Sequence, residues 1–346
     1  MAQTEAGHDL GERADALLAW FAQRARGFPW RREPRTPYRV WVAEAMLQQT
    51  RAATVVPYYE RWMARFPDVE ALAAAELGDV LALWEGLGYY RRARALHAAA
   101  RTVVHDLRGR WPEDEEGWRA LPGVGPYTAA AIAALAFGRP TVAVDGNVRR
   151  VGARLLADPA PRDAELTRRL SALLDPDEPG RTSEALIELG ATVCTPRAPG
   201  CDACPLRPAC HAAASGSPEA FPRRRARAPV PTRERWALVV LDPARGLRLE
   251  RRPEDGLLGG LWGFAQRDVR PPGRELDGLD QVYSHFRLRL RPVLVDPDGA
   301  ATSDEDPHDG DATGAWIAFD RLETLALSRV DRRLLQRLRA EGLLAS

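Results

Sequence analysis

The spacing of apolar residues changes once along this chain. Over residues 9–210, apolar positions recur every three or four residues in alanine- and leucine-rich stretches, with glycine and proline between them. That spacing predicts a series of amphipathic helices. After residue 232, apolar residues alternate with polar ones or form short runs, which is typical of strands. Phe286, Leu288 and Leu290, for example, are predicted to share one face of a strand.

The change in spacing divides the chain into two predicted domains. We expect an all-α domain over residues 9–210 and an α+β domain over residues 232–346, closed by a helix near its end. The residues between them, 211–231, are rich in serine, proline and alanine and carry an arginine cluster, as expected of a basic linker. Residues 297–314 are acidic and predict a loop. A length of 346 residues suits two domains.

Composition excludes some functions and leaves others open. The net charge of +1 neither requires nor excludes a nucleic-acid partner. The chain contains no lysine, since all 49 basic residues are arginine, so no mechanism can use a lysine nucleophile. No apolar run reaches the roughly 18 residues that a membrane span needs. Acidic residues precede the first apolar stretch, unlike in a secretory signal, and we expect a cytoplasmic protein without membrane contact.

All four cysteines lie within residues 194–210, with the spacing C-x6-C-x2-C-x5-C. Four thiols this close together predict one metal site with four ligands. Two disulfides are one alternative, and a zinc site with four cysteine ligands is a nearer one. The uneven spacing and the prolines near the ligands favour one [4Fe-4S] cluster per chain. Its ligands would be Cys194, Cys201, Cys204 and Cys210.

The segment LPGVGPYT at residues 121–128 separates two predicted helices. Its two glycines, Gly123 and Gly125, predict a tight hairpin with exposed backbone N–H groups at the positive end of the next helix. This string matches the helix-hairpin-helix DNA-binding motif, which holds phosphates without reading sequence. Asp145 follows an apolar run shortly afterwards, two residues before Asn147. Taken alone, Asp145 is as well explained by a turn or a helix cap.

The hairpin, the aspartate and the cysteine window occur in the order found in helix-hairpin-helix base-excision DNA glycosylases. The chain resembles the adenine DNA glycosylases of the MutY family over residues 9–210 and in the C-terminal domain. The resemblance rests on FPWRRE (28–33), AEAMLQQT (43–50), GLGYYRRARALH (86–97), LPGVGPYT (121–128), VDGNVRRV (144–151) and the cysteine window. It implies an all-α glycosylase domain with a [4Fe-4S] cluster loop, followed by a Nudix-like domain.

The resemblance assigns catalysis to two carboxylates and a tyrosine. Glu44 would protonate adenine, and Asp145 would stabilise the cationic sugar. Glu44 lies in an otherwise apolar stretch, where burial would raise its pKa and keep it protonated. Tyr127 stands where glycosylases with lyase activity carry lysine. The resemblance therefore implies a monofunctional enzyme that leaves an abasic site, with Tyr127 orienting Asp145.

Further residues are assigned to DNA by the resemblance alone. Three would form the adenine pocket, two would fill or wedge the duplex, and one would lie near the opposite base. In that order they are Trp30, Arg31 and Glu184, then Gln49 and Tyr89, then Thr50. Contacts to backbone phosphate are expected from Gly123, Gly125 and Arg149.

The C-terminal domain is expected to inspect the base opposite adenine. The segment GLLGGLWGFA at 256–265 resembles the Nudix fold, but the carboxylate run of a Nudix pyrophosphatase is missing. In the family, a Phe-Ser-His turn reads 8-oxoguanine. Here the corresponding residues are Tyr283, Ser284 and His285, so the aromatic ring is kept and a hydroxyl is added.

The expected partner is double-stranded DNA with adenine opposite 8-oxoguanine or guanine, bound by a monomer beside the nucleoid. Two other functions remain open. One is an endonuclease III-type glycosylase and lyase acting on oxidised pyrimidines, which the absence of lysine disfavours. The other is a non-catalytic iron–sulfur DNA-binding protein, which the pair Glu44 and Asp145 disfavours.

Overall fold

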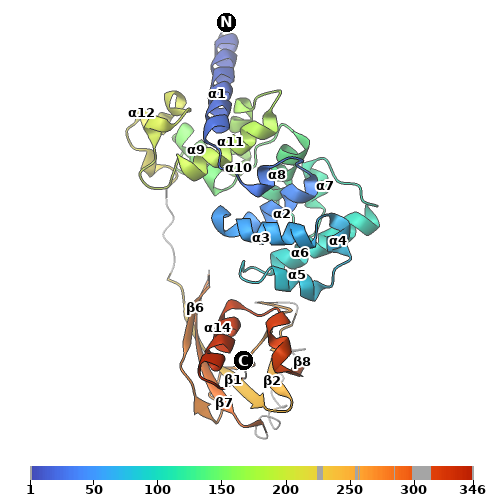
Figure 1. Ribbon diagram of the computed structural model, residues 1–346. Coiled ribbons are helices and arrows are strands. Elements are labelled where there is room, and N and C mark those ends of the chain that lie inside the picture. Colours follow the sequence, from blue (N-terminus) through green and yellow to red (C-terminus); the bar gives the residue numbers. More distant parts are fainter. Residues whose placement is uncertain are drawn as a thin grey trace. The chain divides into compact units, whose positions relative to one another are not determined.

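The computed structural model describes residues 2–223, 229–253, 256, 258–283, 285–297 and 313–344. The chain divides into two compact units (Figure 1). The first comprises Met1–Ala73 and Ala98–Ala226, and the second comprises Ala74–His97 and Arg227–Ser346. The helical segment 74–97 therefore belongs with the C-terminal strands, because contacts in space, not continuity along the chain, define the unit. Ser284 and most of the acidic segment 297–314 lie outside the described residues.

The first unit is helical, as the apolar spacing predicts. Its longer helices are α1 (Ala2–Arg24), α2 (Pro37–Leu47), α3 (Ala52–Arg65), α8 (Pro126–Phe137), α9 (Gly146–Leu155), α10 (Asp163–Leu170) and α11 (Pro179–Thr192). The shorter ones are η1 (Pro29–Arg31), α4 (Val69–Ala73), η2 (Thr102–Asp106), α7 (Glu115–Arg119), η3 (Ser171–Leu173), η4 (Cys201–Ala203), η5 (Arg207–Ala209), α12 (His211–Ala214) and η6 (Pro218–Ala220). Helix α6 (Arg91–Arg101) continues from the second unit into the first.

Caps and prolines set the starts of the helices that carry the candidate site. The Thr36 side chain accepts a hydrogen bond from the Arg39 N–H at the start of α2, directly before Pro37. Helix α8 starts with a proline and ends at Gly138, whose φ of 63° is in the left-handed region. Asp145 caps α9. Each of these starts is visible in the sequence as a turn or capping residue.

Close packing of α9 and α11 brings two distant segments together. Gly190 of α11 lies against Asn147 of α9, and a Cβ atom at Gly190 would be 2.7 Å from the Asn147 Cβ. No larger side chain fits there without a shift. The buried side chains Leu17, Val148, Leu166 and Leu186 fill the core around these helices.

The first half of the predicted linker, residues 211–231, is folded. Helix α12 and the turn η6 occupy the first half of 211–231, and Ala212 is fully buried. The Arg154 guanidinium donates a hydrogen bond from Nε to the Phe221 carbonyl at 3.1 Å. This end of the segment is therefore attached to the helical unit. Strand β1 begins at Thr232, as the change in spacing predicts.

The second unit combines a sheet with helices. Its elements are α5 (Leu77–Leu83), the first part of α6, β1 (Thr232–Asp242), β2 (Gly246–Arg251), β3 (Trp262–Gly263), β4 (Gln266–Arg267), β5 (Arg274–Glu275), β6 (Leu279–Val282), β7 (Arg287–Val295), β8 (Thr313–Ile317), η7 (Phe319–Thr324) and α14 (Arg329–Ala340). The strand order is β3-β2-β1-β7-β5, with β4 beside β1, β6 beside β7 and β8 beside β2. Strands β1 and β7 are parallel, and the sheet is mixed.

The strand pattern in β7 agrees with the sequence prediction. Phe286, Leu288 and Leu290 are buried, whereas Arg287 and Arg289 between them are exposed. The apolar side chains pack in one core with Leu334 and Leu338 of α14, among others. Apolar residues alternate along the strand and recur every three or four residues along the helix. Each element therefore has one apolar face, which is buried in this core.

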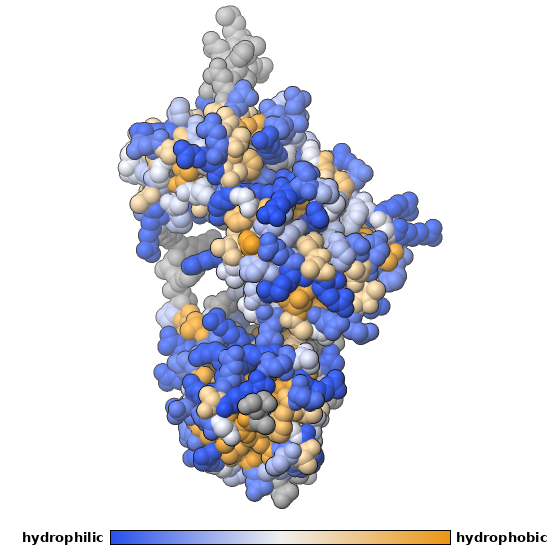
Figure 2. All heavy atoms as spheres, in the orientation of Figure 1, coloured by the Kyte–Doolittle hydropathy of each residue, from blue (hydrophilic) through white to orange (hydrophobic). Residues whose placement is uncertain are grey.

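Polar side chains cover most of the visible face of each unit (Figure 2). Among the described residues, the large apolar side chains that are exposed include Tyr89, with 46% of its surface accessible. A single exposed aromatic ring is common on protein surfaces and does not by itself indicate a partner. No helix in the described part of the chain has the length and apolar character to cross a membrane.

Candidate active site

The predicted hairpin joins α7 to α8. Gly123 is exposed and has a φ of 73°, in the left-handed region that favours glycine. Leu121 and Val124, by contrast, are buried and anchor the turn. Gly125 occupies the cap position of α8 without a side chain that could use the first N–H groups. The N-terminus of α8 is thus available to an anion, as a phosphate contact requires.

Glu44 of α2 lies in the interior of the first unit. Its exposure is 6%, and the Tyr127 hydroxyl of α8 donates a hydrogen bond to its Oε2 atom at 2.9 Å. The hydroxyl expected to orient Asp145 therefore binds Glu44 instead. Burial raises the Glu44 pKa to about 7, as predicted from its apolar surroundings. The Tyr127 hydrogen bond lowers that pKa, and the negative charges of Asp145 and Glu184 raise it. At neutral pH, Glu44 therefore holds a proton for a large part of the time.

Asp145 caps α9 and is a half-buried carboxylate. Its Oδ1 atom accepts hydrogen bonds from the backbone N–H groups of Asn147 and Val148 at 2.8 and 2.7 Å. The Asn147 side chain donates to Oδ2 at 2.8 Å. Burial raises the Asp145 pKa, and these donors oppose that shift. The cap and the charged role are compatible, because the cap fixes the position of the carboxylate.

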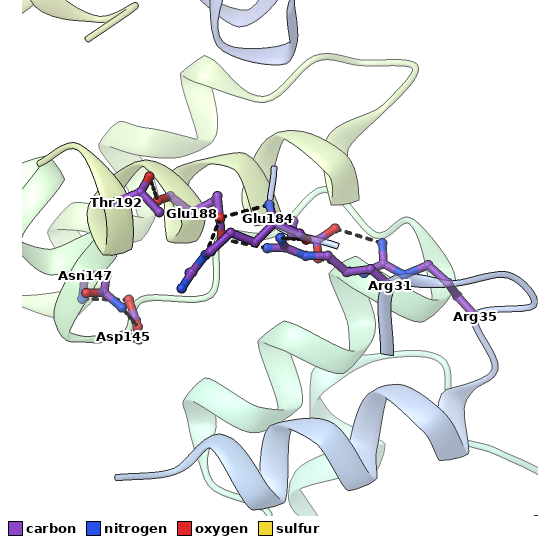
Figure 3. Close-up of polar contacts among 8 residues, drawn as sticks. Arg31, Arg35, Asp145, Asn147, Glu184, Glu188 and Thr192 are labelled. Carbon is purple, nitrogen blue, oxygen red and sulfur yellow. Dashed lines mark hydrogen bonds and ion pairs between the residues drawn. The ribbon is translucent and has the colours of Figure 1, made fainter. Parts of the chain in front are cut away.

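Two carboxylates of α11 hold arginines from the N-terminal segment (Figure 3). Arg31 donates from Nε to Glu184 at 2.7 Å and from Nη2 to Glu188 at 3.0 Å. Arg35 donates to both oxygens of Glu184, at 2.9 and 2.8 Å, and Arg26 binds Glu188. Burial would raise the Glu188 pKa, but the hydrogen bonds and charges of Arg26 and Arg31 lower it.

Trp30 forms part of an aromatic group beside this network. It is buried, with an exposure of 7%. Its ring stacks on Phe28 with a centroid distance of 4.7 Å and meets the Tyr59 ring edge-on at 5.6 Å. The structure thus brings the two predicted pocket residues Trp30 and Arg31 together on one short turn, η1.

The residues after α2 have different surroundings. Gln49 is exposed and has a φ of 58°, which is uncommon for a residue other than glycine. Thr50 is half-buried, and its hydroxyl donates to the Gln48 carbonyl at 3.4 Å. Gln48 donates from Nε2 to the Thr128 hydroxyl of α8 at 3.1 Å. A strained and exposed Gln49 on such a support is suited to contact a partner.

The residues assigned to 8-oxoguanine belong to the second unit. The half-buried Tyr283 stacks on Phe286 with a centroid distance of 4.7 Å, and His285 is exposed. Burial raises the Tyr283 pKa to about 12, with a further contribution from the charge of Asp331. Ser284 lies outside the described residues. The assignment of these residues to 8-oxoguanine stays a prediction.

The four cysteines lie close enough to affect one another. Burial raises the Cys204 pKa to about 11, and the charges of Cys194, Cys210 and Cys201 raise it further. Mutual repulsion of this kind is what a bound cation or cluster would relieve. Among the described residues, no group of three or more His, Cys, Asp and Glu side chains is arranged to hold a single metal ion. The cluster assignment stays a prediction.

Arginines connect the cysteine loop to α9. Arg154, with an exposure of 2%, donates to the Cys194 Sγ atom at 3.2 Å. Arg150 donates to the Cys194 carbonyl at 2.6 Å and to the Asn147 side chain at 2.9 Å. A continuous set of hydrogen bonds therefore leads from Asp145 to the cysteine loop.

Arg149 has other partners and is partly exposed. Its Nη2 atom pairs with the Asp163 carboxylate at 2.5 Å. A phosphate would have to compete with that carboxylate or share the guanidinium with it. Contact of Arg149 with DNA stays a prediction.

The sequence interpretation missed several residues of this site. They are Arg26, Arg35, Gln48, Glu188, Arg150 and Arg154. Glu188 could have been found, because it follows Glu184 by four residues and so lies on the same face of a helix. The arginines had no such signal in a chain with 49 basic residues, all of them arginine.

Two family profiles match the chain. The helix-hairpin-helix superfamily of base-excision DNA repair proteins matches residues 42–176, and the Nudix domain matches residues 236–337. A thermostable thymine-DNA glycosylase has 27% identity over 61% of this chain and 98% of its own, with a TM-score of 0.55. A non-covalent endonuclease III–DNA complex has 25% identity over 59% of this chain and 94% of its own, with a TM-score of 0.51.

The fold and the site thus define a helix-hairpin-helix DNA glycosylase of base-excision repair with a C-terminal Nudix-like domain. The adenine DNA glycosylase of Homo sapiens is 40% identical over 92% of this chain and 72% of its own length. That of Mycobacterium tuberculosis is 39% identical over 73% of this chain and 84% of its own. The chain belongs to the adenine DNA glycosylases.

Proposed function

We propose that this protein removes adenine opposite 8-oxoguanine or guanine in double-stranded DNA and leaves an abasic site. The observation that carries the proposal is the pair of Glu44 and Asp145. One is a buried carboxyl group with a pKa of about 7, and the other is held by backbone donors that favour its ionised form. An acid and an anion are the two groups that cleavage of this bond needs.

In the proposed reaction, the bond between the sugar C1′ and adenine N9 breaks, and its electron pair stays with adenine. The Glu44 carboxyl group gives its proton to N7, so that adenine leaves as a neutral base. Asp145 stabilises the positive charge on the sugar. Water then adds to C1′, and its proton returns to a carboxylate of the site. Tyr127 keeps Glu44 in place through its hydrogen bond.

The proposed enzyme is monofunctional. A lyase step needs an amine that forms a Schiff base with the sugar, and the chain has no lysine. Tyr127 hydrogen-bonds to Glu44 at the hairpin position where the resemblance predicts lysine in lyases. Borohydride treatment of the enzyme with substrate is therefore expected to give no covalent enzyme–DNA product. A high yield of that product would favour the endonuclease III-type alternative instead.

DNA binding is proposed to use both units. Gly123 and Gly125 would contact phosphate, and Trp30, Arg31 and Glu184 would surround the flipped adenine. The wedge residues would be Gln49 and Tyr89, with Thr50 near the opposite base. In the second unit, Tyr283, Ser284 and His285 would read 8-oxoguanine. Because adenine is a normal base, discrimination has to come from its partner. We further propose that the protein acts as a monomer.

The four cysteines are proposed to hold a [4Fe-4S] cluster. Their mutual influence on ionisation and the buried donor Arg154 at Cys194 suit a group that binds thiolates. When bound, the cluster would stabilise the fold of this loop, while Glu44 and Asp145 supply both roles at the sugar. Iron and sulfide analysis is expected to give four of each per chain. Stoichiometric zinc with no sulfide would contradict this.

Adenine release from four matched duplexes tests the main proposal. Adenine is placed opposite 8-oxoguanine, guanine, cytosine or thymine, and single-turnover rates are compared. The rate is expected to be highest opposite 8-oxoguanine, with guanine next. Equal rates on all four would contradict the role of the second unit, and release of oxidised pyrimidines alone would contradict the substrate class.

A further inference from the structure

The predicted wedge residue Tyr89 lies on an unusual turn of the second unit. Gly86, Gly88 and Tyr89 have φ angles of 100°, 71° and 49°. Glycine adopts such angles readily, but tyrosine does not. Tyr89 is also exposed. A bulky residue keeps a disfavoured backbone conformation only where its surroundings hold it there.

Part of this support comes from the segment itself. The Trp84 indole donates to the Gly88 carbonyl at 3.0 Å. Arg92 donates to the carbonyls of Leu87 and Gly88 at 3.2 and 3.1 Å. Its guanidinium also lies over the Tyr89 ring, 5.5 Å from the centroid. These contacts hold the backbone of the turn at Leu87 and Gly88.

The remaining support comes from the C-terminal part of the same unit. Glu85, before the turn, accepts two hydrogen bonds from Arg332 of α14, from Nε at 2.7 Å and from Nη2 at 2.8 Å. Tyr90, directly after Tyr89, donates from its hydroxyl to the Leu327 carbonyl at 3.1 Å. The exposed turn is therefore held on both sides by residues that are 237 to 247 positions away in the sequence.

Arg332 and Leu327, which bind the residues on either side of the turn, are themselves held by further contacts. The Arg332 guanidinium also donates to the carbonyls of Leu322 and Leu325, at 3.2 and 2.8 Å, so its orientation is set by the Nudix-like fold. Leu327 forms a parallel bridge with Trp262, the first residue of β3. A two-pronged arginine–carboxylate pair with both partners mostly buried keeps one geometry.

We propose that Glu85 and Arg332, with the Tyr90–Leu327 hydrogen bond, are positioning residues that hold Tyr89 ready for insertion into the duplex. The C-terminal domain would thus control the wedge in addition to reading the opposite base. The inference rests on the proposed function, in which Tyr89 enters DNA. A ring that is held in place before binding loses less conformational freedom when it separates stacked bases.

A double-mutant cycle with Tyr89 tests the inference in the full-length protein. Glu85→Gln and Arg332→Gln are each made alone and together with Tyr89→Ala, and single-turnover adenine release opposite 8-oxoguanine is measured. Each single change is expected to slow release about tenfold, within the range of coupling inside one network. In the Tyr89→Ala protein, the same changes are expected to add nothing, since there is no wedge left to position.

Arg333→Gln is the matched control on the same helix. Arg333 is exposed and donates to the Asp280 carbonyl at 3.1 Å, away from the turn, so this variant should release adenine like the unchanged protein. Unfolding temperatures of all variants are compared in parallel. A loss that is equally large with and without Tyr89 would show a general structural effect and overturn the inference.

The failures of the two proposals are distinguishable. If Tyr89→Ala leaves adenine release unchanged, the wedge role in the proposed function fails, and this inference fails with it. If Tyr89→Ala slows release but neither Glu85→Gln nor Arg332→Gln does so, only the inference fails. A fluorescent base analogue opposite the wedge gives a second readout, since its unstacking on binding should decrease in both positioning variants.

Discussion

The pocket of Glu44 and the turn of Tyr89 prepare a side chain in opposite ways. Glu44 is buried, and removal from water gives it the pKa that its proposed role needs. Tyr89 is exposed, and its readiness comes from a backbone held by surrounding contacts. The proposed acid thus depends on electrostatics inside one helical unit. The wedge depends on mechanical support from a distant part of the sequence.

The largest effect is expected from Asp145→Asn, which removes the proposed charge at the sugar. Asparagine is as good a helix cap as aspartate, so the fold should change little. Adenine release should fall about 10³-fold, as with loss of a main stabiliser of transition-state charge. Single-turnover release and duplex binding measure the two effects separately. Release at the normal rate would refute the role of Asp145.

Glu44→Gln is expected to reduce release about 10²-fold, in the range of general acid catalysis. The unchanged enzyme should be active below pH 7 and lose activity as pH rises through the Glu44 pKa of about 7, because only the protonated carboxyl can give a proton. The variant should lack this basic limb. Rates measured over the pH range check this, and an unaltered limb in Glu44→Gln would assign it to another group.

Tyr127→Phe is expected to slow release by about tenfold at most, the equivalent of one ordinary hydrogen bond. The Tyr127 hydroxyl lowers the Glu44 pKa, so its loss should move the basic limb to higher pH. A pH–rate profile of this variant separates the two effects. A limb displaced to lower pH would mean that the hydrogen bond favours the protonated carboxyl instead.

The smallest effects are expected from Arg35 and Glu184, which form one ion pair near Glu44. The Glu184 charge raises the Glu44 pKa, and the Arg35 charge lowers it. Arg35→Gln should therefore move the basic limb to higher pH, and Glu184→Gln should move it to lower pH. In the double variant, the two shifts should largely cancel. Rate changes at low pH should be only a few-fold.

Arg168→Gln serves as the control for this pair. Arg168 pairs with Glu165 on the exposed side of α10, so its removal should leave the limb in place. Shifts in the same direction for Arg35→Gln and Glu184→Gln would point to a disturbed pocket. The Glu44 pKa would then depend on the packing of the first unit as well as on the charges around it.

Local sequence was enough to predict most of the fold. Three- to four-residue spacing predicted the helices, and alternation around Leu288 predicted β7. The glycines Gly123 and Gly125 predicted the hairpin. Such features depend on neighbours along the chain. The placement of residues 74–97 with the C-terminal strands could not be predicted, because it depends on pairs such as Glu85 with Arg332.

The amino-acid sequence specifies which chemical groups this protein has: a glutamate in an apolar helix, an aspartate at a cap position, four clustered cysteines and no lysine. The surroundings of each group, and with them its pKa and its partners, follow from the tertiary structure. Burial and the Tyr127 hydrogen bond act on the pKa of Glu44. Glu188 of α11 binds Arg31, and Arg332 of α14 binds Glu85 beside the turn of Tyr89. The physical reason is that desolvation and ion pairing depend on distances in space, which local spacing does not contain.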